Sequence, residues 1–275
     1  MVDVSASLKR ALPPITVARR PLSNNPLASI IDEAQVAAAW QHVGEKIRAA
    51  AIETSPFALI RIDDVFPADF YELLVGQLPG NSAYDFSTAE DYAVIGNEVR
   101  RGGLRFDEPS NISRLPTPAQ AFWRQVTEPG ITKQLTQALI AKFRPHLEVP
   151  TEAVQPGQPV NIFGKWLLSR DLAGYELPPH VDVRQKLVAG LFYLPDAGQE
   201  SPYGTTILTP KLDLADSLTG RDRYYREHFD VAIQVPFHAN SFLAFVRSDR
   251  SFHGVDTVGP EVTQRNILMF NVNIA

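Results

Sequence analysis

The stretch LPPHVD at residues 177–182, followed by the apolar run LVAGLFYL at 187–194, decides the fold class. A proline directly before His180 favours extended backbone. In an extended strand, residues i and i+2 point to the same side, so His180 and Asp182 can present a nitrogen and an oxygen to one point. The apolar run has the composition of a buried β-strand. We therefore expect a β-sheet that carries candidate metal ligands.

Further strand-like runs surround this stretch in the C-terminal half of the chain. They are predicted at residues 160–168, 186–194, 205–209, 231–235, 242–246 and 265–273. The N-terminal half shows helical periodicity instead, with helices predicted at 29–51, 67–78, 118–127 and 131–143 and one strand at 56–63. Residues 81–111 are polar and irregular. Short strands after a run of helices predict an α+β chain with a β-sandwich or barrel after residue 150.

Composition excludes several classes of function. The 275 residues include no cysteine, which excludes disulfides, a cysteine zinc site, an iron–sulfur cluster and a thiol nucleophile. The net charge of −5 argues against binding to nucleic acid. No apolar run reaches the roughly 20 residues of a membrane helix, and the first residues do not resemble a signal peptide. We therefore expect a cytoplasmic location and no membrane partner.

Residues 1–28 have a different character from the rest. Four prolines prevent helix formation there, and four basic residues make the segment locally positive. We expect an N-terminal arm, which either binds a phosphate or a partner or is a solvated tail. The remaining residues, 29–275, are expected to form a single domain.

Two His-x-Asp pairs occur, whereas 6 histidines and 17 aspartates predict about 0.4 by chance. The second pair, His228 and Asp230, follows a charged stretch typical of a surface loop or a short helix. On a helix, residues i and i+2 diverge, so these side chains would not converge. His180 and Asp182 are therefore the better candidates. Two histidines and one carboxylate around open positions are typical of non-haem Fe(II) oxygenases.

The third candidate ligand is His253, which follows the apolar strand at 242–246. Arg265 begins the last predicted strand and shares a face with Ile267 and Met269. An arginine on this otherwise apolar face needs a buried anion, and the planar guanidinium suits a carboxylate. The carboxylate of a cosubstrate could be that anion.

These residues, in this order, resemble the Fe(II)/2-oxoglutarate-dependent oxygenase superfamily, and in particular its prolyl-4-hydroxylase-like branch. His253 lies 71 positions after Asp182, and Arg265 lies 12 positions after His253. The supporting segments are GYELPPHVD (174–182), LFYLP (191–195), GTTIL (204–208), NSFLAF (240–245) and SFHGV (251–255). The resemblance implies a double-stranded β-helix (jelly-roll, cupin-like) core at 151–275 with supporting helices at 29–150.

The resemblance also implies a role for each matched residue. His180, Asp182 and His253 would bind Fe(II), and Arg265 and Tyr193 would bind the distal carboxylate of 2-oxoglutarate, with O2 as second cosubstrate. Tyr193 serves equally well as a core residue. One departure from the usual pattern is Thr205, which stands where the family has a second glycine; we expect it to matter little.

The implied activity is hydroxylation of an unactivated carbon, with decarboxylation of 2-oxoglutarate to succinate. A small molecule, such as an amino acid or a natural-product intermediate, is the first candidate substrate. A peptidyl side chain is the second and a sugar precursor the third. Arg170 and Arg184 are candidate substrate residues, although Arg170 also suits a surface ion pair. Segment 210–230 is either a lid or a surface insertion.

Two rival hypotheses remain. A cupin-like metalloenzyme that does not use 2-oxoglutarate would not need Arg265. A non-catalytic barrel would bind metal or 2-oxoglutarate without turnover. A homodimer is compatible with either hypothesis.

Overall fold

Two antiparallel sheets form the centre of the molecule in a computed structural model, which describes residues 32–86, 94–95, 98–149, 160–195, 198–211 and 224–275. The elements below belong to one unit, Ile31–Ala275. The expected arm at 1–28 and most of segment 210–230 lie outside the described residues.

The larger sheet has the order β1-β10-β7-β12-β5-β4. Its strands are β1 (Leu59–Ile62), β4 (Arg101–Arg105), β5 (Ile162–Leu172), β7 (Lys186–Tyr193), β10 (Ser241–Val246) and β12 (Gln264–Ile274). The smaller sheet has the order β6-β11-β8-β9. Its strands are β6 (Leu177–His180), β8 (Ser201–Pro210), β9 (Phe229–Phe237) and β11 (His253–Val255). A short hairpin joins β2 (Val94–Ile95) and β3 (Glu98–Val99).

The strand order identifies the core as a jelly roll. Strands β5 to β12 divide into 5-12-7-10 in one sheet and 6-11-8-9 in the other, as in two interlocked Greek keys. Hydrogen bonds between the described strands do not close these sheets into one barrel. The expected α+β fold with a jelly-roll core is confirmed.

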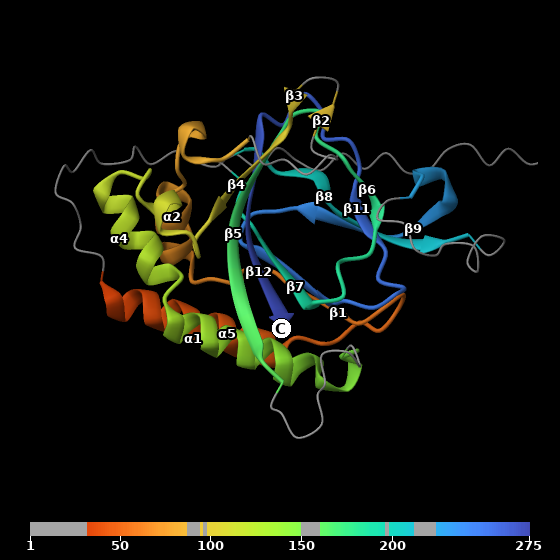
Figure 1. Cartoon of the computed structure of the whole chain (residues 1–275), viewed down its shortest axis with the longest axis horizontal. Helices are drawn as coiled ribbons and strands as arrows, with labels where there is room; N and C mark the ends of the chain where they lie inside the picture. Colours follow the sequence, from red (N-terminus) through yellow and green to blue (C-terminus); the bar gives the residue numbers. More distant parts are fainter. Residues whose placement is uncertain (1–31, 87–93, 96–97, 150–159, 196–197, 212–223) are drawn as a thin grey trace, which may run out of the picture. The chain divides into compact units, whose positions relative to one another are not determined.

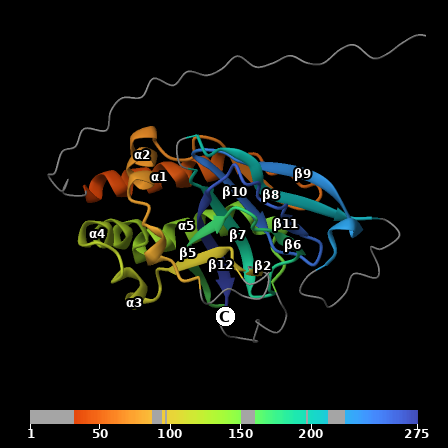
Figure 2. The ribbon, with the colours of Figure 1, turned by 90° about the horizontal axis from the view of Figure 1, so that it is seen from above.

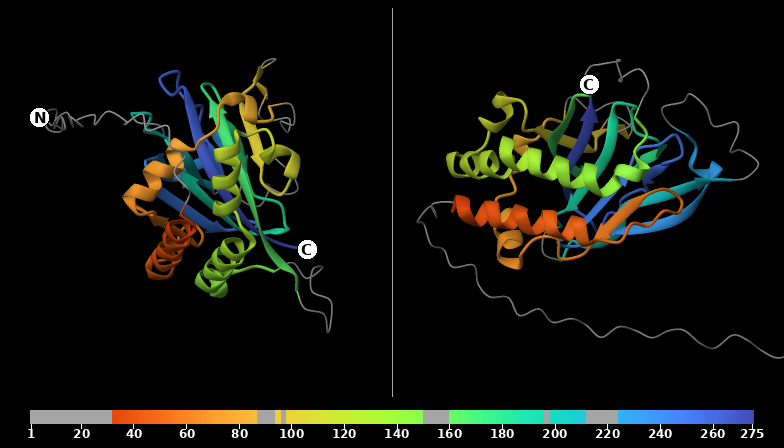
Figure 3. Two further views of the ribbon diagram at one scale, coloured as in Figure 1. Left: turned by 90° about the vertical axis from the view of Figure 1, so that its left-hand side faces the viewer. Right: turned by 90° about the horizontal axis from the view of Figure 1, so that it is seen from below.

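Helices cover the outer face of the larger sheet. They are α1 (Glu33–Ala49), α2 (Ala68–Gly76), α3 (Pro109–Ile112), α4 (Thr117–Val126) and α5 (Pro129–Phe143). Short 3-10 turns are η1 (Asn81–Ala83), η3 (Arg144–His146) and η5 (Arg226–His228), of which η5 leads into β9 of the smaller sheet. Figure 2 shows α1, α4 and α5 on one side of β7 and β12, and the smaller sheet on the other. In Figure 3, α1 (red) and α5 (green) run side by side beneath the sheet.

Aromatic side chains join the helices to the sheet. Trp40 of α1 lies edge-on to Trp166 of β5 and Phe192 of β7, with ring centroids 5.2 Å and 5.5 Å apart. Asp32 caps α1 by accepting a hydrogen bond from the backbone N–H of Ala34 at 2.9 Å. A second apolar cluster, which includes Leu191 and Phe245, fills the space between the two sheets.

The sequence analysis did not predict the short hairpin β2–β3, nor the strands β4, β6 and β11. β4 lies within residues 81–111, which were expected to be irregular because the two glycines and two arginines of the strand hide any alternation. β6 contains Pro178 and Pro179, which are unusual in a strand. These prolines are tolerated because β6 is the edge strand of its sheet. β11 spans only three residues. Among the described residues, the structure shows no helix long and apolar enough to cross a membrane.

Candidate metal centre

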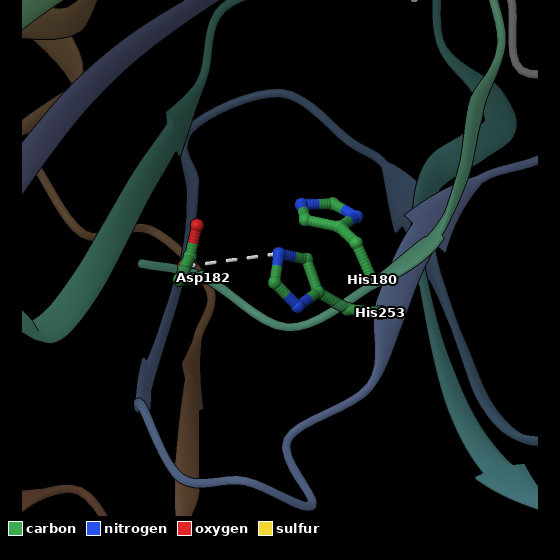
Figure 4. A group of neighbouring side chains, drawn as sticks. All are labelled: His180, Asp182 and His253. Atoms are coloured by element: carbon green, nitrogen blue, oxygen red, sulfur yellow. Dashed lines mark ion pairs between the residues drawn. The ribbon is translucent and has the colours of Figure 1, made fainter. Parts of the chain in front are cut away.

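β6 and β11 bring the two predicted histidines together. They pair antiparallel, with His180 directly opposite His253, and the ring centroids are 4.2 Å apart. Asp182 lies on the loop just after β6 and faces both rings (Figure 4). One ligand atom from each residue lies within 4.8 Å of the other two, so the three residues form a group that could hold one metal ion.

Backbone carbonyls orient both imidazoles. The Nδ1 of His180 lies 3.0 Å from the carbonyl oxygen of Pro178, and the Nδ1 of His253 lies 3.0 Å from that of Ser251. Nδ1 must carry a proton to donate to a carbonyl, so each neutral ring presents an unprotonated Nε2. This is the arrangement in which metal-binding histidines are usually held.

The Asp182 carboxylate has one oxygen engaged and one without a partner. Its Oδ1 accepts a hydrogen bond from the Lys186 ammonium at 2.7 Å. Its Oδ2 is buried without a hydrogen-bond partner and lies 3.8 Å from the Nε2 of His253. A buried oxygen of this kind is costly unless a cation binds it. The three side chains therefore fit a divalent metal ion.

Electrostatics keeps Asp182 ionised. Burial would raise the pKa of its carboxyl, but the charge and the hydrogen bond of the Lys186 ammonium reverse this effect, and His253 and His180 lower the pKa further when they are protonated, so the pKa lies well below its ordinary value. The carboxylate is thus available as a ligand at neutral pH.

A cavity of about 180 Å³ joins this triad to Arg265. Apolar side chains line much of it, including Leu191, Phe245, Ile267 and Met269. The sequence prediction that Arg265, Ile267 and Met269 share one face is thus confirmed. Thr205 and Arg101 also line the cavity.

The anion that binds Arg265 is the carboxylate of Asp171, whereas the sequence analysis suggested the carboxylate of a cosubstrate. Arg265 is fully buried, and its Nη1 donates to Asp171 Oδ2 at 2.7 Å. Its Nη2 donates to the carbonyl oxygen of Gly204 at 2.8 Å, and its Nε has no partner. Burial lowers the pKa of Arg265 and Asp171 opposes that shift. Burial of Arg265 alone therefore does not require a cosubstrate carboxylate.

Asp171 also binds a second arginine that sequence reasoning missed. Arg101 of β4 donates to both oxygens of Asp171, from Nε at 2.5 Å and from Nη2 at 2.9 Å. The predicted strand at 160–168 stops short of Asp171. Extending it would have placed Asp171 on the same face as Leu167 and Ser169. Nothing in the sequence around Arg101 indicated a strand.

Tyr193 and Thr205 form a hydrogen-bonded pair. The hydroxyl of Tyr193 lies 2.6 Å from that of Thr205, and burial raises the pKa of Tyr193 to about 12. Thr205 lines the cavity, whereas Tyr193 lies behind it in the apolar cluster between the sheets. The expectation that Thr205 matters little for the chemistry stays a prediction; the structure shows that Thr205 lines the cavity and bonds to Tyr193.

The two candidate substrate arginines do not line this cavity. Arg170 points to the opposite face of β5 from Asp171 and is 3% exposed. It donates to Asn266 at 2.8 Å and to Asn81 at 2.7 Å, and it lies over the Tyr84 ring. These buried contacts contradict a surface ion pair, and Arg170 is not among the residues that line the cavity at the triad. Arg184 is exposed on the loop after Asp182.

No protein-family model matches the chain, and no curated protein matches it. Several solved structures do match the chain. A prolyl-4-hydroxylase from Pseudomonas putida is 14% identical, with a TM-score of 0.44 over 87% of this chain and 99% of that one. A 2OG-Fe(II) oxygenase family protein from Burkholderia pseudomallei is 13% identical, with a TM-score of 0.42 over 88% and 89%.

Two of these structures thus carry the names prolyl-4-hydroxylase and 2OG-Fe(II) oxygenase family protein. HygX from Streptomyces hygroscopicus, solved with nickel, 2-oxoglutarate and hygromycin B, is a third, at 13% identity and a TM-score of 0.41 over 78% of this chain and 82% of that one. At these identities and TM-scores, the matches do not establish what this chain binds or does.

Proposed function

We propose that this protein is an Fe(II)- and 2-oxoglutarate-dependent dioxygenase that hydroxylates a small molecule. The observation that carries the proposal is the buried, partnerless Oδ2 of Asp182 between two oriented imidazoles. Two histidines and one carboxylate leave coordination positions open, which is the donor set of non-haem Fe(II) oxygenases. Bound iron would supply the activation of O2 that is coupled to decarboxylation of 2-oxoglutarate to succinate.

The cavity supports 2-oxoglutarate as cosubstrate. Arg101 and Arg265 both bind Asp171 and both line the cavity, so two guanidinium groups lie at one end of it. Buried charge of this kind is stabilised by an anion. The Nε of Arg265 and the hydroxyl of Thr205 are polar groups that a carboxylate would contact from the cavity.

The remaining lining positions substrate and excludes water. Leu191, Phe245 and Ile267 form apolar walls between the triad and the arginines. Such walls strengthen the electrostatic contacts of bound ligands because they lower the local dielectric constant. His180 and His253 are held by backbone carbonyls, so the ligand geometry does not depend on the substrate.

The test is anaerobic addition of Fe(II) and then 2-oxoglutarate to the metal-free protein, followed by visible absorption. We expect a charge-transfer band that requires both additions. It should be lost in Asp182→Ala and weakened in Arg265→Ala. Asp230→Ala is the matched control, because Asp230 belongs to the other His-x-Asp pair and is exposed on β9.

Each outcome has a defined meaning. No band in folded wild-type protein would overturn the proposal. A band that persists in Asp182→Ala would place the metal elsewhere, and full binding of 2-oxoglutarate by Arg265→Ala would favour a cupin-like enzyme. A band without succinate release, across small-molecule and prolyl-peptide candidates, would favour a non-catalytic barrel.

A further inference from the structure

Asp182 lies where the chain crosses from one sheet to the other. The loop 181–185 joins β6 of the smaller sheet to β7 of the larger sheet, and Figure 1 shows both strands. His180 and His253, by contrast, lie on paired strands. Loops are more mobile than the strands that they connect. The carboxylate of Asp182 therefore needs contacts of its own to keep a fixed position beside the two imidazoles.

Arg247 anchors the backbone of this loop. It directly follows β10, is 9% exposed, and donates from Nε to the backbone carbonyl oxygen of Asp182 at 3.1 Å. Its Nη2 contacts Asp249 Oδ1 at 2.7 Å, and its backbone N–H donates to the carbonyl oxygen of Leu187 at 3.0 Å. Because the backbone of Asp182 is fixed in this way, rotation of its side chain decides which carboxylate oxygen faces the imidazoles.

Lys186 fixes that rotation. Its ammonium donates to Asp182 Oδ1 at 2.7 Å, and the two side chains are only 18% and 11% exposed. Lys186 is the first residue of β7, and its backbone N–H donates to the carbonyl oxygen of Val183. A charge-assisted hydrogen bond is stronger in such a buried place than in water. Oδ1 is therefore occupied, and Oδ2 is the oxygen that lies beside His253 without a hydrogen-bond partner.

The number of oxygens that Asp182 offers decides how many positions on a metal ion stay open. Carboxylates bind metal ions through one oxygen or through both. Two imidazoles and one oxygen would leave three positions of an octahedral ion open, whereas a second oxygen would leave two. Because a 2-oxo acid that chelates the ion takes two positions, only binding through one oxygen leaves a place for a further ligand.

We propose that Lys186 is a positioning residue that limits Asp182 to one metal-binding oxygen and so keeps one coordination position open. A merely structural ion pair would stabilise the fold and leave the coordination of the metal unchanged. The inference rests on the proposed function, because it concerns the metal centre of the same site.

Mn(II) in place of iron tests this proposal, because Mn(II) is paramagnetic and relaxes the protons of the water molecules bound to it. Mn(II) is added to the metal-free protein, and free Mn(II) is quantified by its EPR signal. The water-proton relaxation rate per bound ion then gives the number of bound water molecules. We expect about three in wild type, one for each open position, and about one after 2-oxoglutarate is added.

The variant is Lys186→Met, which keeps most of the side-chain length and removes the donor. Both oxygens of Asp182 should then turn to the ion, so the relaxation rate per bound ion should fall by about a third. Lys186→Arg should retain the wild-type rate, because a guanidinium also donates to a carboxylate. Lys165→Met is the matched control, since Lys165 is exposed on β5 and does not line the cavity.

Arg247→Gln separates the anchoring of the loop from the choice of oxygen. Loss of the contact with the Asp182 backbone should weaken Mn(II) binding by about 10- to 100-fold. Each bound ion should still carry the wild-type number of water molecules, because Lys186 continues to occupy Oδ1. An equal loss of water in Arg247→Gln would show that the loop, and not Lys186, sets this number.

Three further results would overturn the inference. These are a wild-type water number that fits binding through both oxygens, an unchanged rate in Lys186→Met, and a higher rate in Lys186→Met, which would mean that Asp182 has left the ion. If Lys186→Met does not fold, Lys186→Gln replaces it, because its shorter side chain moves the donor away from Oδ1. Failure of wild type to bind Mn(II), or equally tight binding by Asp182→Ala, would instead reject the metal centre and with it the proposed function.

Discussion

Asp182 and Asp171 show how one residue type serves two purposes in this protein. Asp182 keeps one oxygen without a partner and points it between two imidazoles. Asp171 has both oxygens engaged by arginines and is fully buried. The first carboxylate is arranged to bind a cation that is added from outside. The second stabilises cations that belong to the chain.

Tyr193 carries a pH dependence that tests its buried environment. Its pKa rises from 10.0 to about 12 because burial disfavours the phenolate. A raised pKa contributes stability that is fully present below the unfolded value and is lost as the pH rises through the folded value. Wild type should therefore lose part of its stability advantage over Tyr193→Phe above pH 10.

Urea unfolding of wild type and Tyr193→Phe at pH 9 and pH 11 measures this effect. The difference in free energy of unfolding should shrink by about 1 kcal/mol, since one pKa unit corresponds to about 1.4 kcal/mol. A difference that is constant between these pH values would show that Tyr193 ionises as easily in the folded protein as in the unfolded chain.

At the scale of elements, the metal centre depends on the close approach of two short strands. β6 and β11 meet at His180 and His253, and the next residue, Gly254, lies against the backbone of β6. A Cβ at Gly254 would come within 2.5 Å of the carbonyl oxygen of Leu177. Only glycine allows this separation of the strands.

Gly254→Ala should therefore displace β11 and with it the imidazole of His253. We expect metal affinity to fall at least about tenfold, because displaced ligands lose their geometry. Anaerobic titration with Co(II) monitors this change by its visible absorption. Gly76→Ala at the end of α2 is the control, since a Cβ there meets no atom within 4 Å. Equal affinities in the two variants would contradict the role given to Gly254.

At the scale of the whole molecule, the helices and the metal centre lie on opposite faces of the larger sheet. Trp40 of α1 is 2% exposed and contacts three aromatic rings, two of them on the sheet. The triad lies between the sheets instead. Stability and metal binding should therefore respond separately to changes in the helical layer.

Trp40→Ala tests this separation. Truncating a fully buried tryptophan should lower the free energy of unfolding by about 3–5 kcal/mol. Folded Trp40→Ala should still bind Co(II) with wild-type affinity. Val231→Ala on β9, where the side chain is 47% exposed, should change stability by less than about 0.5 kcal/mol. Parallel loss of stability and metal affinity in Trp40→Ala would show that the two layers are coupled.

Local patterns in the sequence predicted most of the elements and singled out the three candidate metal ligands. Alternation and apolar runs depend on neighbouring residues, so the long strands and the helices were found close to their observed bounds. His180 and Asp182 could be paired because i and i+2 share a face in extended backbone. β6 and β11 were not predicted, because the two prolines of β6 and the three-residue length of β11 give no periodic pattern.

Only the tertiary structure decided what surrounds Arg265. The sequence by itself indicated that this arginine needs a buried anion, but not which one. Asp171 is 94 residues away along the chain and Arg101 lies on a strand without a pattern. Cross-strand register places them in one row, and register is set by the pairing of whole strands. Residues that are brought together by such pairing cannot be predicted as partners from the sequence immediately around either of them.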